Sequence, residues 1–149
     1  MIIDNMKAKG RLSIVLKDAD GNIKDQREVD NLVVSAGLDY IASRMKDATA
    51  TAMSHMALGS GTTAAAAGDT DLESVLGSRE ALDSTTVTDN TVQYISSFEA
   101  GDGTGAVTEA GIFNASTGGT MLCRTVFDVV NKGANDTLSI TWTITISAS

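Results

Sequence analysis

The chain has 149 residues, 42% of them hydrophobic, and a formal net charge of −8, which favours one soluble domain large enough to bury a core. Its single cysteine, Cys123, excludes an intramolecular disulfide, and its single histidine, His55, excludes a multi-histidine metal site. The acidic charge and the scattered Lys and Arg argue against nucleic-acid binding, and no apolar run approaches the roughly 20 residues needed to cross a membrane.

The N-terminal third predicts an arm followed by a hairpin. We expect residues 1–10 to form an arm and residues 11–149 to form a single domain. Residues 11–17 alternate between apolar and polar side chains, as a strand with one buried face does. The sequence DADGN at residues 18–22 is typical of a hairpin turn, after which the chain runs back as a second strand.

One helix is predicted, over residues 36–45. Ser35 precedes it as the expected N-cap, because a serine hydroxyl can accept a hydrogen bond from a free N–H group of the first turn. The apolar side chains that follow have the i, i+3, i+4, i+7 spacing of an amphipathic helix, and they are Leu38, Ile41, Ala42 and Met45.

The remainder of the chain has the pattern of β-structure. Strands are expected over residues 54–58, 91–99, 106–113 and 120–127, at intervals of roughly ten residues and with Gly, Asn and Asp in the turns. Residues 137–147 alternate strictly between apolar and polar side chains and predict the clearest strand. The predicted fold is mainly β: an antiparallel β-sandwich or jelly-roll-like barrel with one short α-helix.

A glycine-rich stretch, MSHMALGSGTTAAAAGDTDL at residues 53–72, resembles a nucleotide-binding loop when it is taken alone. Gly59, Gly61 and Ala64 have the spacing G-x-G-x-x-A of dinucleotide-binding proteins. That site also needs a crossover helix after the glycines, and here the alanine segment is only four residues long and ends at Gly68. No lysine follows the glycines, so a P-loop is excluded as well.

No other group of residues completes a catalytic, cofactor or metal site. His55 lacks a nucleophile-elbow motif, and Cys123 lacks a second histidine as partner, so we interpret both as structural. The turn at residues 18–22 lacks the closing glutamate of a calcium loop, and Asp102 lies in what we take to be an ordinary glycine loop. We therefore expect a protein that is not an enzyme and that binds no cofactor or metal.

One carboxylate stands out because it lies inside an apolar strand. Glu109 in the sequence TEAGIF either faces solvent or is paired, and Arg124 on the predicted neighbouring strand is the available partner. This pairing would be structural.

Four segments taken together resemble a family of small structural proteins of tailed bacteriophages. They are NLVVSAG (31–37), MSHMALGSGTTAAAAGDTDL (53–72), TEAGIFNASTGGTMLCRTVF (108–127) and VNKGANDTLSITWTITIS (130–147). The resemblance extends from about residue 30 to the end. It implies a β-rich, oligomeric virion component.

Two roles follow from this resemblance. The first is a capsid decoration, or cement, protein that sits as a homotrimer on the outside of the expanded head and bridges neighbouring copies of the major capsid protein. The second is a component of a tail fibre, head fibre or tail tip that takes part in host adhesion. The short chain favours decoration, because a fibre usually needs a shaft or an attachment domain. The expected location is the capsid surface of the virion, and the host cytoplasm during assembly.

Two segments are predicted to make the contacts with other subunits. The arm carries Ile2, Ile3 and Met6, which a monomer has little reason to expose; a disordered tail is the alternative. The loop at residues 59–69 is rich in small residues and is expected at a rim where subunits meet, with Gly59, Gly61 and Thr62 as its contact residues. Neither segment is expected to contact nucleic acid or a membrane.

Overall fold

Nine strands and one helix make up the described part of the chain, residues 5–46 and 50–148 of a computed structural model. In chain order they are β1 (Met6–Lys17), β2 (Ile23–Val33), α1 (Ser35–Arg44), β3 (His55–Gly59), β4 (Val75–Ala81), β5 (Ser84–Thr88), β6 (Thr91–Phe98), β7 (Gly105–Phe113), β8 (Met121–Lys132) and β9 (Thr137–Ala148).

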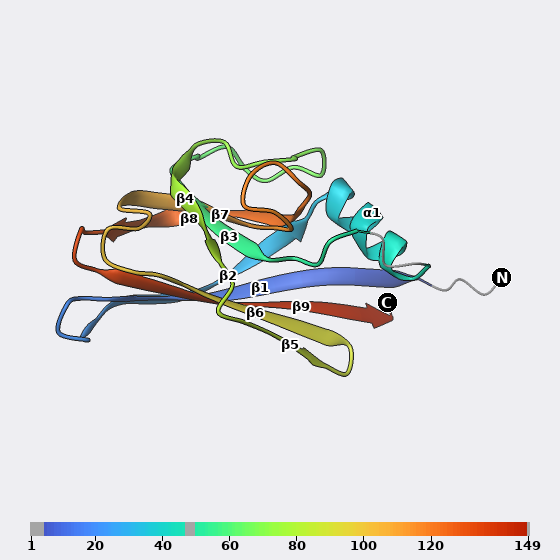
Figure 1. Ribbon diagram of the computed structural model, residues 1–149, viewed down its shortest axis with the longest axis horizontal. Coiled ribbons are helices and arrows are strands. Elements are labelled where there is room, and N and C mark those ends of the chain that lie inside the picture. The colour runs from blue at the N-terminus through green and yellow to red at the C-terminus, as the bar shows by residue number, and fades with distance from the viewer. Residues whose placement is uncertain (1–4, 47–49, 149) are drawn as a thin grey trace.

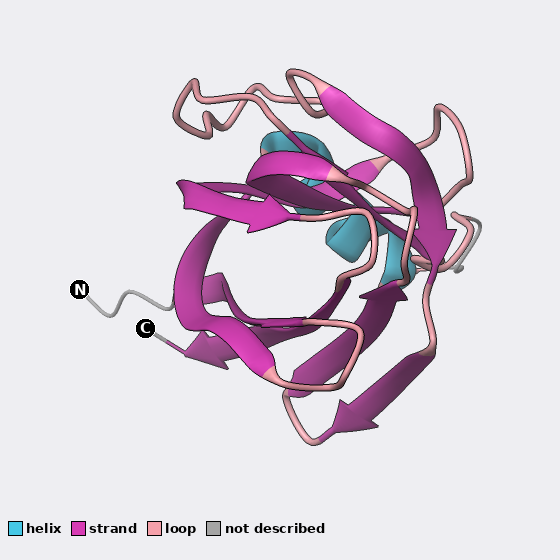
Figure 2. Ribbon diagram, turned by 90° about the vertical axis from the view of Figure 1, so that its left-hand side faces the viewer, coloured by secondary structure: helices cyan, strands magenta, loops and turns pink. Residues whose placement is uncertain are grey.

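The strands form one antiparallel sheet that curls over on itself, in the order β4-β3-β7-β8-β2-β1-β9-β6-β5 (Figure 1). The strand β2 makes the bend, because it pairs with β1 along most of its length and with β8 only at Leu32 and Val33. Viewed from one end, the two halves of the sheet face each other around the core (Figure 2). The prediction of a mainly β, antiparallel sandwich or barrel-like fold with one short helix is confirmed.

The core lies between the two halves of the sheet and follows the predicted alternation. In β9 every second side chain from Leu138 to Ile144 is buried, with Leu138, Ile140 and Trp142 fully enclosed. Strand β1 pairs with β9 in a register that sets Leu12 beside Trp142 and Ile14 beside Ile140. The opposite half of the sheet supplies Met56, Leu58, Ile112 and Leu122. Each such side chain contributes about 1.5–3 kcal/mol by burial, so this face of β9 accounts for much of the cohesion of the fold.

The arm predicted over residues 1–10 is wrong in its second half. Residues 6–10 belong to β1, where Met6 pairs with Ala148 and Gly10 pairs with Ile144 on one side and Asn31 on the other. Met6 is 67% exposed, but its backbone is part of the sheet. Ile2 and Ile3 lie outside the described residues.

The helix α1 is present as predicted, although it packs on a different face. Val34 is its N-cap residue and Ser35 begins the helix, with no side-chain cap. Gly37 is buried against β8. A Cβ at this position would lie 2.1 Å from the carbonyl oxygen of Leu122. This close approach turns Tyr40 and Ile41 toward the core and leaves Leu38 exposed.

Candidate functional site

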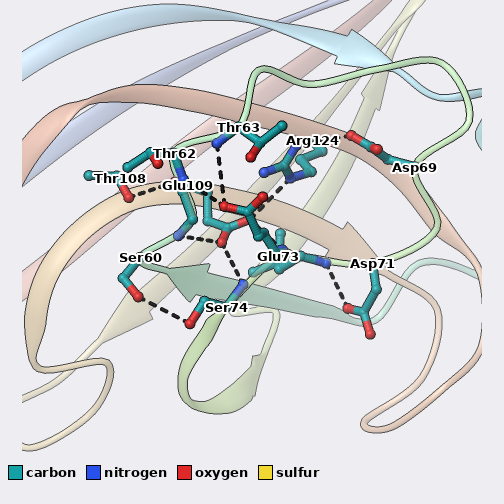
Figure 3. A network of polar contacts seen from close by, with 12 residues as sticks. Ser60, Thr62, Thr63, Asp69, Asp71, Glu73, Ser74, Thr108, Glu109 and Arg124 are labelled. Carbon is teal, nitrogen blue, oxygen red and sulfur yellow. Dashed lines mark hydrogen bonds and ion pairs between the residues drawn. The ribbon is translucent and has the colours of Figure 1, made fainter.

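The most buried charge in the described chain is the carboxylate of Glu109 in β7, and it is surrounded by hydrogen-bond donors (Figure 3). Its Oε2 accepts hydrogen bonds from the backbone N–H groups of Gly61 (2.6 Å) and Ser74 (2.9 Å). Its Oε1 accepts from the N–H of Glu73 (2.9 Å) and from Nε of Arg124 (3.0 Å). Four donors compensate for the loss of water around the buried carboxylate.

The partner Arg124 is itself buried and holds a second acid. In the register of the two strands, Arg124 in β8 pairs with Gly111 in β7. Glu109 is two positions before Gly111, so its side chain and that of Arg124 lie on the same side of the sheet. Its Nη1 donates to Oδ2 of Asp69 at 2.9 Å. The predicted pairing of Glu109 with Arg124 is confirmed, and the third member, Asp69, comes from the loop between β3 and β4.

A second carboxylate, that of Glu73, organises the start of the same loop. Its Oε1 accepts hydrogen bonds from the N–H groups of Thr62 (3.0 Å) and Thr63 (3.4 Å). The side-chain hydrogen bond of Thr63, together with these two backbone bonds, holds the pKa of Glu73 below its usual value. The hydroxyl of Thr108 donates to the carbonyl of Gly61 at 2.7 Å. We call the connected set Glu109, Arg124, Asp69, Glu73 and Gly61 the Glu109 network.

The glycines of the loop are explained by this network. A Cβ at Gly59 would lie 2.6 Å from Cγ of Glu109, and one at Gly61 would lie 2.1 Å from its Oε2. Only a glycine lets the backbone come this close to the carboxylate. The glycine spacing that resembles a nucleotide-binding loop therefore serves an internal acid.

The prediction that Gly59 and Gly61 contact other subunits is wrong, because both are buried within the chain. Thr62 is exposed, and its role in a contact stays a prediction. Ile2 and Ile3 lie outside the described residues. Met6 lies in the paired strand β1.

A smaller polar cluster closes the far end of β8. The buried ammonium group of Lys132 donates to the carbonyls of Glu99 (2.9 Å) and Asp136 (2.7 Å), and burial lowers its pKa. The carboxylate of Asp136 accepts from Nζ of Lys24 and from the N–H of Gly133, both at 2.7 Å, which lowers the pKa of Asp136. These contacts connect the loops at this end of the sheet.

The two residues considered as reactive groups lie in different strands, β3 and β8. Oγ of Ser54 and Nδ1 of His55 are 2.8 Å apart at the start of β3. Cys123 is fully buried in β8, and burial raises the pKa of its thiol, so the reactive thiolate is disfavoured. Within residues 5–46 and 50–148, no three side chains of His, Cys, Asp or Glu are grouped as a metal site would require.

The described surface has an apolar region at the end of the sheet that α1 covers. A hollow of about 320 Å³ lies between α1, the segment at residues 52–53 and strands β5, β6 and β9. Most of its lining is apolar, including Ile41, Val92, Tyr94, Ile144 and Ile146. Burial raises the pKa of Tyr94 far above its ordinary value, as expected for a phenol in apolar surroundings.

A second, smaller hollow continues this apolar region across the helix. It shares Ile41 and Ile146 with the first and adds Met6, Leu38 and Met45. Those three side chains are 67%, 48% and 77% exposed. We call the two hollows and these three residues the apolar end. The helical spacing of Leu38 and Met45 predicts buried positions, so this exposed apolar region was not expected.

Comparisons with protein-family models, with curated proteins and with solved structures found no match to this chain. In the portion that the structure describes, no helix has both the length and the apolar character of a membrane span.

Proposed function

We propose that the protein is a structural component of a tailed-phage virion, and specifically a decoration protein that binds the outside of the expanded head. The resemblance of the four sequence segments suggests this role. The structural observation that supports it best is the apolar end, where Met6 at the start of β1 and Leu38 and Met45 on α1 and its C-terminal end expose apolar surface. Apolar surface collected in one place is typical of a protein that binds another protein.

The proposed mechanism is stabilisation by mass action. A protein that binds only the expanded shell stabilises that state by RT ln(1 + [L]/Kd) at each site, where [L] is the concentration of free protein. Repetition over a symmetric shell adds weak contacts through multivalency. In this proposal a homotrimer bridges neighbouring copies of the major capsid protein, and the net charge of −8 keeps free trimers soluble before docking.

Electron cryomicroscopy of virions tests this function. We expect density for the protein in many copies over the head surface. Density in a few copies at a vertex or on the tail would instead support a role in host adhesion and would contradict decoration. The mass of the free protein in solution is a simpler first measurement, since a strict monomer at high concentration contradicts the homotrimer.

A further inference from the structure

One edge of the sheet borders the apolar end and is open. Strand β5 pairs with β6 along one side, and among residues 5–46 and 50–148 no strand pairs with its other side. All five residues of β5, STTVT, are exposed. An open edge of this kind offers a row of backbone donors and acceptors to another strand.

The hairpin geometry tells which backbone groups are available. The carbonyl of Thr88 accepts a hydrogen bond from the hydroxyl of Thr91 at 2.8 Å, so it points toward β6. Backbone groups of successive residues in an antiparallel strand point to alternate sides. The N–H and C=O groups of Thr86 therefore also face β6, and those of Thr85 and Val87 face outward.

The same two residues join this edge to the apolar hollow. The side chains of Thr85 and Val87 both line the hollow, and Val87 is 70% exposed. A strand added outside β5 would extend this wall of the hollow by one strand. Its side chains opposite Thr85 and Val87 would lie on the same face of the sheet, so an apolar residue at each of these two positions would be partly removed from water.

The charges at the ends of β5 indicate which strand would fit. Asp83 precedes the strand and Asp89 follows it, and the nearby Glu80 has its pKa raised by burial and by the neighbouring Asp102. If a second copy of β5 paired here in antiparallel fashion, Asp83 of each copy would face Asp89 of the other, and like charges opposite one another are destabilising. A strand with a cation at each end would instead be attracted at both.

We propose that the outer edge of β5 binds an extended segment of a partner protein by strand addition. The segment carries Lys or Arg at both ends of a stretch of five residues, and apolar residues at the two positions that face the hollow. This inference deepens the proposed function and rests on it only in taking the protein to act by binding another protein. Strand addition obtains affinity from the backbone and specificity from alternate side chains.

A synthetic peptide tests the proposal without any phage material. The probe is acetyl-Lys-Thr-Val-Thr-Val-Thr-Lys-amide, added to the full-length protein up to about 1 mM and followed by NMR. We expect saturable binding, with the largest shifts and the strongest gain in hydrogen-exchange protection at the amides of Thr85 and Val87. Two control peptides have glutamate in place of both lysines, or N-methyl groups on the backbone that faces β5. Both controls should bind more weakly.

Variants of the protein separate the contributions of charge and backbone. Asp83→Asn with Asp89→Asn should weaken binding roughly two- to thirtyfold, as loss of two exposed ion pairs does. Asparagine suits position 89, where the backbone φ is 51°. Val87→Pro removes an outward N–H and should weaken binding by about fivefold or more, while the β5–β6 pairing stays intact. Asp20→Asn, an exposed acid in the β1–β2 turn, is the control for net charge and should bind as the parent does.

Several results would overturn the proposal. They are the absence of saturable binding, equal binding of the glutamate peptide, shifts centred away from β5, or a dimer that Val87→Pro dissociates, which would make a second copy the occupant. Peptide binding together with absence of the protein from virion heads would reject the proposed function and leave this inference standing. Decoration of heads without peptide binding would do the reverse.

Discussion

The Glu109 network buries charged groups, whereas the apolar end exposes apolar side chains to solvent. In neither region does the sequence pattern predict the whole arrangement. The network brings four charged side chains and a glycine together, and each of its hydrogen bonds is made within the chain. The apolar end consists of ordinary helix and strand residues, yet it leaves Leu38, Met45 and Val87 in contact with solvent. The residues with the more distinctive sequence pattern therefore lie in the interior, and residues with an ordinary helix or strand pattern form the exposed apolar surface.

The largest effect on stability is expected from Arg124→Met. This change leaves the buried Glu109 without its cation and Asp69 without its partner, and loss of one member of a buried ion pair costs about 3–5 kcal/mol in the free energy of unfolding. Urea denaturation measures it. Arg11→Met is the control, because Arg11 pairs with Glu28 on the surface and the loss should stay below about 1 kcal/mol. Equal effects of the two changes would mean that the network contributes no more than a surface pair.

Gly61→Ala should have the next largest effect. The added Cβ would lie 2.1 Å from Oε2 of Glu109, so the loop must move away from the carboxylate, at a cost of about 1–3 kcal/mol. Gly68→Ala is a matched control in the same loop, because nothing lies within 4 Å of its Cβ position. There we expect no loss, or a gain of about 0.4–1 kcal/mol from the less flexible unfolded chain. Thermal unfolding of the pair distinguishes close approach from loop flexibility.

A smaller and graded effect is expected on acidification. Hydrogen bonds hold the pKa values of Glu73 and Asp136 below their ordinary values. Because the folded-state pKa is the lower one, the stability from these carboxylates is fully present above about pH 4.5 and is lost as pH falls through the folded-state pKa. Glu73→Gln and Asp136→Asn should each flatten the decline of the unfolding free energy in this window. Unchanged slopes would contradict the lowered pKa values.

The smallest effect on stability is expected at the apolar end. Leu38→Ser combined with Met45→Ser alters residues that are already 48% and 77% exposed, so the free energy of unfolding should change by about 0.5 kcal/mol or less. Binding of the protein to expanded, undecorated heads should nevertheless weaken, if this end makes the contact. Unchanged binding would assign the contact to another surface.

Local patterns predicted most strands but missed what depends on distant neighbours. The alternation in β9 was sufficient, since one of its faces is continuously apolar and buried. The first residues of β1 lack such a face: Met6 is exposed, Ala8 is only partly buried, and their order comes from pairing with β9. No pattern in residues 1–10 can show that partner, because it lies more than 130 positions away along the chain.

The candidate site, like the fold, was predictable only where it depends on neighbouring strands. The pairing of Glu109 with Arg124 follows from a cross-strand rule, so it could be expected. The N–H donors of Gly61, Glu73 and Ser74 could not, because they come from the ends of a long loop that only the folded chain brings together. Similarly, the exposure of Leu38 depends on the contact of Gly37 with the carbonyl of Leu122, which helical spacing does not show.

The central place of β9 has a consequence for synthesis of the protein. It lies between β1 and β6, and it pairs with β1 over the full span from Met6↔Ala148 to Lys17↔Thr137. Ribosomes add about 5–20 residues each second, so β1 waits several seconds for this partner to be made. During that interval the apolar faces of β1 and β6 lack the strand that separates them. The sheet can therefore be completed only after β9 has been made, and until then the apolar faces of β1 and β6 are available to chaperones.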